Sequence, residues 1–184
     1  MSSELGTPMR GASVQDRRVV LAAARVAFDG LTGLLWQVTG PELAPLVEEL
    51  DALSCAAAGA VVAAVAEADA RGEIAASQAG TSAQWVAQHA PSLAAEGAGQ
   101  VARLVQECRR PELAPVRDAV ERGRLPVGVG LSVISEFQAL RPMLRDEARP
   151  TVLDGLLQMG AEHGRVGVRR LRPAMLARFG DPGV

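Results

Sequence analysis

Apolar positions recur with helical spacing along most of the chain. From Gln15 to Val38 they fall three or four residues apart, and a second series runs from Leu43 to about Arg71. The second series is close to a heptad repeat: Leu43, Leu46, Leu50, Leu53, Ala57, Val61, Ala64 and Ala68. This pattern is typical of two long helices packed side by side. We therefore expect a long antiparallel helix pair at the N-terminal end.

Capping residues divide the remainder into shorter helices. Thr39 and Glu42 fit a capping box at the start of the second helix, and Gly72 is placed to end that helix. The following "GEIAASQAG" has the composition of a linker. Thr81 is then predicted to cap a short helix that carries Trp85.

The second half of the chain continues in the same way. Ser92 is predicted to cap a helix whose apolar stripe comprises Leu93, Gly97, Val101, Leu104 and Cys108. Further helices are expected before Gly123, around Ile134, near 150–163 and near 166–179, with Pro173 able to kink the last or to start a separate turn. No stretch alternates with a period of two residues. The pattern predicts an all-α fold of about seven or eight helices: residues 1–14 as a flexible N-terminus and 15–180 as a single helical domain.

The apolar stripes also predict the core. The residues expected to be buried are Leu46, Leu50, Val61, Leu93, Val101, Leu104, Ile134, Leu156 and Leu171.

Composition agrees with helices and constrains location. The 184 residues are rich in Ala and Val and include five aromatic residues, a balance that favours close-packed helices over a sheet sandwich. Cys55 and Cys108 lie in apolar helical patterns and are expected to be reduced and buried. No signal peptide opens the chain, and the Ala-dominated uncharged run Ala52–Ala66 is shorter than the ~18 apolar residues of a membrane span. We expect a cytoplasmic protein with no membrane association.

Charge is distributed unevenly. Residues 1–100 contain five Arg and eleven acidic residues, whereas residues 101–184 contain fourteen Arg and ten acidic residues. A helix through 165–179 would have an apolar stripe of Val168, Leu171, Met175 and Phe179. Arg165, Arg169 and Arg172 would line one flank of that stripe, at spacings of four and three residues. These three are candidate phosphate contacts for weak, non-specific DNA binding. The alternative is an ordinary solvated helix face.

The stretch over residues 80–104 has the layout of a helix-turn-helix, but its second helix lacks the side chains that read bases. That helix begins with Ser92, three apolar residues and Glu96, and Arg103 lies three turns further on. Base-reading side chains are typically Arg, Lys, Asn or Gln, and phosphates would repel Glu96. We therefore expect this helix pair to be part of the core, with Trp85 anchoring the first helix.

No catalytic or metal-binding pattern is present in the sequence. His89 and His163 are far apart, and neither has a Cys, Asp or Glu at a zinc-ligand spacing. The Gly-rich "GVGLS" at 128–132 lacks the Lys of a phosphate-binding loop, and there is no nucleophile elbow. We expect a protein that is not an enzyme and has no cofactor and no metal.

The order of these motifs resembles the family called domain of unknown function 222, or the 13E12 repeat family. Trp85–Ala87 corresponds to the family's Trp-Leu-Ala element, and Ser92–Leu104 corresponds to its Ser-capped helix. Ala119–Pro126 corresponds to its Ala-Leu-x-x-Gly-x-Ile-Ser element, and Ile134 lies in the helix that follows. Pro126 stands where the family pattern has Ser. The resemblance covers roughly residues 20–180.

The resemblance carries expectations about function. Proteins of this family often have a His-Asn-His (HNH) nuclease domain after the helical part, but this chain has no Asn and no His after His163. It therefore implies a helical portion without its nuclease: a non-catalytic accessory domain of an HNH-endonuclease-associated protein, with DNA as the partner. The alternative is a protein-interaction or homo-oligomerisation module, which the long Ala-rich seam would also suit.

Overall fold

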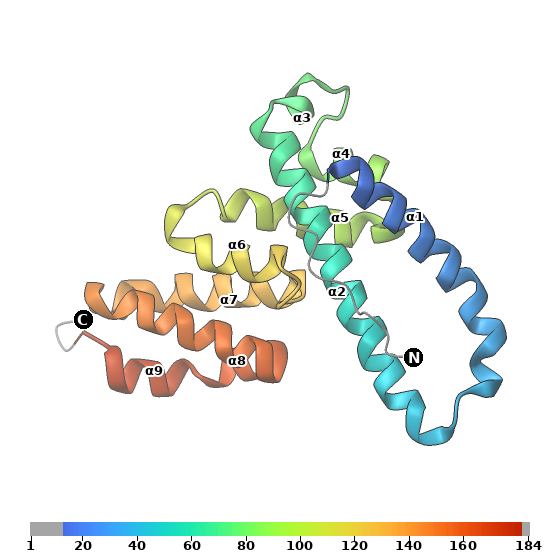
Figure 1. Cartoon of the computed structure of the whole chain (residues 1–184). Coiled ribbons are helices and arrows are strands. Elements are labelled where there is room, and N and C mark those ends of the chain that lie inside the picture. Colours follow the sequence, from blue (N-terminus) through green and yellow to red (C-terminus); the bar gives the residue numbers. More distant parts are fainter. Residues whose placement is uncertain (1–12, 182–184) are drawn as a thin grey trace. The chain divides into compact units, whose positions relative to one another are not determined.

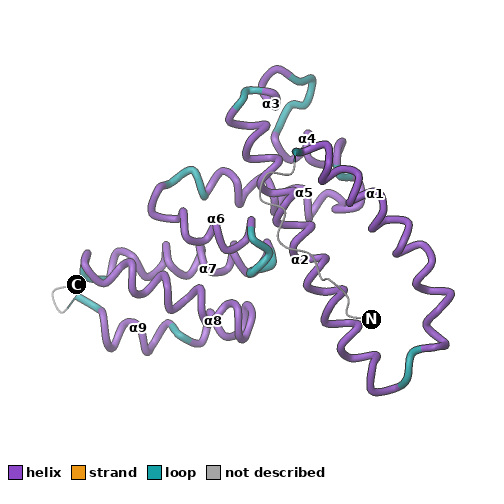
Figure 2. The backbone as a smooth tube through the Cα atoms, in the orientation of Figure 1, coloured by secondary structure: helices purple, strands orange, loops and turns teal. Residues whose placement is uncertain are grey.

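The computed structural model describes residues 13–181, and these residues form an all-α structure with nine α-helices, eight of them of seven or more residues. Figure 2 shows helices joined by short loops and no strand among the described residues. The predicted fold class and helix count are confirmed. The sole pairing of β type in this range is an isolated bridge between Leu144 and Gly180.

The chain divides into two compact units, with the boundary between Glu48 and Glu49, where a single domain over 15–180 was expected. The first unit contains α1 (Val14–Leu31), the 3-10 helix η1 (Thr32–Gln37) and the start of α2 (Gly40–Ala70). The predicted first helix thus leaves α-helical geometry after Leu31. Gly30 and Gly33 flank this change, and glycine lowers the stability of an α-helix interior.

A capping box begins α1, and one half of a capping box begins α2. The Ser13 hydroxyl accepts a hydrogen bond from the Asp16 amide, while the Asp16 carboxylate accepts from the Ser13 amide at 2.8 Å. The Glu42 carboxylate likewise accepts from the amide and hydroxyl of Thr39, at 2.9 and 2.7 Å. These bonds lower the pKa of Asp16 and of Glu42. Helix α2 ends before Gly72, whose φ of 76° is left-handed, as predicted.

The C-terminal part of α2 is packed in the second unit. Val62 and Val65 are buried there. Gly59 allows a close approach to α6 (Ala114–Glu121), because a Cβ at Gly59 would lie 2.2 Å from the carbonyl oxygen of Val120. The absence of a side chain at Gly59 therefore allows α2 to pack closely against α6.

The second unit consists of several helices packed against one another. Besides α6 it contains α3 (Glu73–Ala76), α4 (Ser82–His89), α5 (Ala94–Glu107), α7 (Val127–Leu140), α8 (Arg149–Arg170) and α9 (Arg172–Phe179). Helices α7, α8 and α9 lie against one another, and α5 packs on both α4 and α7 (Figure 1). The core is formed by side chains such as Leu104, Val116, Ile134, Phe137 and Leu156.

Three local predictions were wrong or incomplete. Ser92 does not cap α5: residues Pro91–Leu93 form a 3-10 turn, and the N-cap position is Leu93, without a side-chain cap. The expected linker contains the short helix α3. The expected helix over 166–179 is interrupted at Leu171, because Pro173 lies in the first turn of a new helix, α9.

Other local predictions are confirmed. Gly164 separates two helical segments within α8, with φ 61° and ψ −155°. The helix pair over 80–104 belongs to the core: Val86 of α4 and Val101 and Leu104 of α5 are buried, and Trp85 packs against them.

The predicted core residues fall into two groups. Val101, Leu104, Ile134 and Leu156 are buried, whereas Leu46, Leu50, Val61, Leu93 and Leu171 are partly buried. The leucine side of α2 is thus less covered near its N-terminus than the heptad pattern suggested, and Leu43 and Leu53 are exposed.

Two segments are long and apolar enough to cross a membrane by length and composition alone: Val14–Gln37 and Gly40–Ala70. Both segments contain charged residues, and a spanning segment tolerates a few charges, so the expectation based on uncharged runs did not include them. In the second segment, Gly59, Val62 and Val65 are buried, and 17% of its most apolar stretch is buried in all.

Candidate phosphate-binding pocket

Residues of helices α5, α7 and α8 line an open, polar hollow of about 250 Å³ on the second unit. Its lining residues are Gln100 and Arg103 of α5, Gly128, Leu131, Ser132, Ser135 and Glu136 of α7, and Arg165 and Arg169 of α8. Three guanidiniums from two helices therefore meet at one hollow. The structure brings together two of the three predicted phosphate contacts, Arg165 and Arg169, and adds Arg103.

The three guanidiniums lining the pocket have no carboxylate partner among residues 13–181. Most other arginines of the second unit are in ion pairs, such as Arg109 with Asp69 and Arg122 with Asp118. Arg103, Arg165 and Arg169 are exposed and retain their full complement of hydrogen-bond donors for a ligand. Guanidinium groups recognise phosphate by paired hydrogen bonds, so this cluster is suited to an anion.

Arg165 lies against the first turn of α7. An ideal Cβ at Gly128 would be 1.7 Å from Nη2 of Arg165 and 2.7 Å from its Cζ, so the guanidinium occupies the space that a side chain at position 128 would fill. The first turn of α7 contains no acidic residue, and its N-cap, Pro126, offers no side-chain hydrogen bond. A cation thus lies beside the positive end of a helix dipole, and a bound anion would relieve this repulsion.

Arg172, the third predicted contact, has another partner. Its Nε and Nη2 lie 3.0 and 2.8 Å from Oε2 of Glu136, and it does not line the pocket. Glu136 is the one carboxylate in the pocket lining, and its side chain is largely buried. Arg172 therefore neutralises the group that would most oppose an anion.

The polar neutral residues of the pocket are partly engaged. The Ser132 hydroxyl donates to the Gly128 carbonyl at 3.0 Å, and the Gln100 amide donates to Glu96 at 3.3 Å. Arg103 lies three turns into its helix, too far along it to read bases, and it was not predicted as a phosphate contact. Arg103 lines the same hollow as residues of α7 and α8 because of the way α5 packs in the fold. No residue near Arg103 in the sequence predicts this position.

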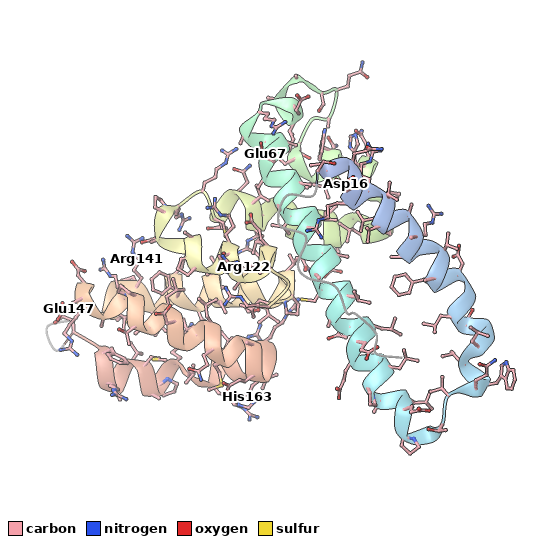
Figure 3. The ribbon with its side chains drawn as sticks, viewed as in Figure 1. Asp16, Glu67, Arg122, Arg141, Glu147 and His163 are labelled. Atoms are coloured by element: carbon pink, nitrogen blue, oxygen red, sulfur yellow. The ribbon has the colours of Figure 1, made fainter. Side chains whose placement is uncertain are left out.

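The histidines lie outside this pocket. Nδ1 of His89 is 2.8 Å from the Trp85 carbonyl oxygen, and its ring stacks on Trp85 with centroids 4.2 Å apart. His163 projects outward from α8, where the nearest carboxylate, Glu162, is 3.9 Å away (Figure 3). Within the described residues, no three or more His, Cys, Asp or Glu side chains are placed to hold a metal ion together.

The two cysteines are free thiols in different surroundings. Cys108 is buried, and burial raises the pKa of its thiol to about 11, with Glu121 and Glu107 adding to the rise and Arg117 opposing it. Cys55 is partly exposed. Its partial burial is the main cause of the raised pKa of its thiol, and the nearby Asp51 carboxylate raises this pKa further. Neither environment is that of an activated thiolate.

Comparison with known proteins adds no relative: no protein-family model, no curated protein and no solved structure matches this chain.

Proposed function

We propose that this chain is a non-catalytic helical accessory domain that contacts nucleic acid through phosphate groups, and that it is related to the helical domains that accompany HNH nucleases. The kinship rests on the motif order described above. The phosphate contact is carried by one observation: Arg103, Arg165 and Arg169 line a single open hollow and have no carboxylate partner among the described residues. Contacts to phosphate hold a protein on a duplex without reading its sequence.

The charge around the pocket supports this proposal. The one acidic lining residue, Glu136, is paired with Arg172, so the cavity presents a net positive surface. The first turn of α7 adds a favourable dipole for an anion at Gly128. A cationic ligand would be repelled by this arrangement.

Salt-dependent binding to a duplex of arbitrary sequence tests the proposal. Each phosphate contact contributes about 0.9 to the slope of log affinity against log salt, so three contacts predict a slope near ~−2.7. Fluorescence anisotropy between about 50 and about 200 mM salt measures this slope. We expect replacement of Arg103, Arg165 and Arg169 by Gln to flatten it and to leave the helical circular dichroism unchanged.

A matched variant controls for net charge. Replacing Arg71, Arg122 and Arg178 by Gln removes the same charge from positions outside the pocket lining and should leave the slope nearly intact. Equal losses in the two triple variants would mean that binding is diffuse, and no binding by the wild type at low salt would overturn the proposal.

A further inference from the structure

The arginine pocket has the size of a compact group rather than of a stretch of polymer. Its volume of about 250 Å³ is on the order of eight water molecules, and pockets for drug-sized ligands begin at ~300 Å³. Arg103 lines it from α5, while Arg165 and Arg169 are about one turn apart on α8. The three guanidiniums therefore serve one small hollow and are not spread along an extended surface.

The charge of the lining exceeds what one internal phosphate of a strand can balance. The three guanidiniums are positive, and the single carboxylate of the lining, Glu136, is paired with Arg172. An internal phosphodiester carries one negative charge, whereas a phosphomonoester carries about 1.5 to 2 at pH 7. Further phosphodiesters lie at intervals along a strand, so a small hollow cannot collect them. A phosphomonoester at the end of a strand therefore matches the pocket better than an internal phosphate does.

The hydrogen-bonding groups of the lining are mostly donors. Each guanidinium has five N–H donors and no acceptor. Ser135 is exposed in the lining, and its hydroxyl has no hydrogen-bond partner within residues 13–181. Gly128 belongs to the first turn of α7, where N–H groups have no partner inside the helix. A phosphomonoester has three strong acceptor oxygens, so it can use donors that approach from several sides.

Two glycines allow the Arg165 guanidinium to reach the pocket. Gly164, immediately before Arg165, has φ 61° and ψ −155°, a conformation that is essentially restricted to glycine. It redirects the chain within α8. Gly128 leaves the space that the guanidinium occupies. Backbone features of two helices thus converge on one side chain, as in a built binding site and not as in a solvated helix face.

We propose that the arginine pocket binds the terminal phosphomonoester of a nucleic-acid strand. This inference rests on the proposed phosphate contact with nucleic acid, and it specifies which phosphate enters the pocket. Hydrolysis of one phosphodiester bond leaves one phosphate end and one hydroxyl end. A cut strand therefore presents the group that the pocket binds, and a continuous strand does not.

Fluorescence anisotropy with duplexes of one sequence and different ends tests the inference. The label is on an internal base, and the ends carry 5′-phosphates, 3′-phosphates or hydroxyls alone. We expect the full chain to bind one phosphorylated duplex at least about tenfold more tightly than the hydroxyl duplex, because hydrogen bonds to charged groups contribute at least this factor. The thymidine monophosphate with the same phosphate position should displace that duplex, whereas thymidine should not.

Two triple variants locate the preference for a phosphorylated end. Arg103→Gln, Arg165→Gln, Arg169→Gln should bind the three duplexes with equal affinity, and the helical circular dichroism should be unchanged because these side chains are exposed. The matched variant Arg71→Gln, Arg122→Gln, Arg178→Gln removes the same charge outside the pocket lining and should retain the preference.

The possible failures of this inference and of the proposed function differ. Equal binding of all three duplexes by the wild type, with the salt slope flattened in the pocket variant, would overturn the inference and leave the proposed function intact. A preference that persists in the pocket variant would also overturn it, because another site would then hold the phosphate. No binding to any duplex at low salt would overturn both. So would binding of a phosphoserine peptide by a chain that binds none of the duplexes.

Discussion

The guanidinium of Arg165 occupies the space in which a side chain at Gly128 would lie. The ideal Cβ position of Gly128 is 1.7 Å from Nη2 of Arg165. Glycine at the start of α7 thus permits a cation from α8 to reach the first turn of another helix. The pairing explains how one wall of the arginine pocket is built, and it supplies a test that leaves every arginine in place.

Gly128→Ala should displace Arg165 and weaken phosphate binding. The obstructed atoms are at the end of a flexible side chain, so Arg165 can move with little cost in stability. We expect the slope of log affinity against log salt to become shallower by about 0.9, the contribution of one phosphate contact. The free energy of unfolding should be nearly unchanged. Gly99→Ala in α5 is the control, because a Cβ there meets nothing within 4 Å. If Gly128→Ala and the wild type bind DNA identically, Arg165 does not contribute a phosphate contact in the pocket.

Arg172→Gln should weaken DNA binding although Arg172 does not line the pocket. The change leaves the Glu136 carboxylate unpaired in the lining, where it repels phosphate. About 1 kcal/mol of repulsion corresponds to roughly a fivefold loss of affinity. The double variant Arg172→Gln, Glu136→Gln should recover wild-type affinity. If the double variant binds as weakly as the single one, Arg172 contacts the ligand directly.

Leu104→Ala should strongly destabilise the second unit. Leu104 is fully buried between α5 and its neighbours, so truncation leaves a cavity and should cost ~2–5 kcal/mol of unfolding free energy. Val166→Ala, at an exposed site, should change it by less than about 0.5 kcal/mol. Urea denaturation followed by circular dichroism measures both. Similar losses for the two variants would contradict the packing described for α5.

Cys108 should resist thiol reagents at pH 8 in the native protein. Its thiol is buried and its pKa is raised to about 11, so little thiolate is present or accessible. In a Cys55→Ser background, reaction with Ellman's reagent should begin only on unfolding. Rapid reaction of the native variant would show that the site opens locally.

The same thiol makes stability depend on pH. Its ordinary pKa is 9.0, so the unfolded chain loses the Cys108 proton before the folded chain does. Stability should therefore fall as pH rises from about 9 to about 11. Cys108→Ala should lack this part of the decline in a urea titration repeated across that range. An unchanged decline would assign it to other groups.

Helix boundaries were predictable wherever the chain carries its own local signal. The hydrogen bond from the Thr39 amide to the Glu42 carboxylate, the left-handed Gly72 and the break at Gly164 all depend on residues a few positions apart. Ser92 failed as a cap because Pro91 begins a 3-10 turn that takes over the start of α5. Local chemistry thus determines where helices begin and end, except where two local signals compete.

The sequence by itself also determined the all-α class, the basic C-terminal part and two arginines of the pocket, Arg165 and Arg169. Only the tertiary structure decided that Arg103 joins them from α5 and that Arg172 is taken by Glu136, 36 positions away. Apolar periodicity reports which side of a helix is buried, but not which other helix it meets. Partners far apart in sequence are selected by packing of the whole core, and the chemistry of the pocket depends on those partners.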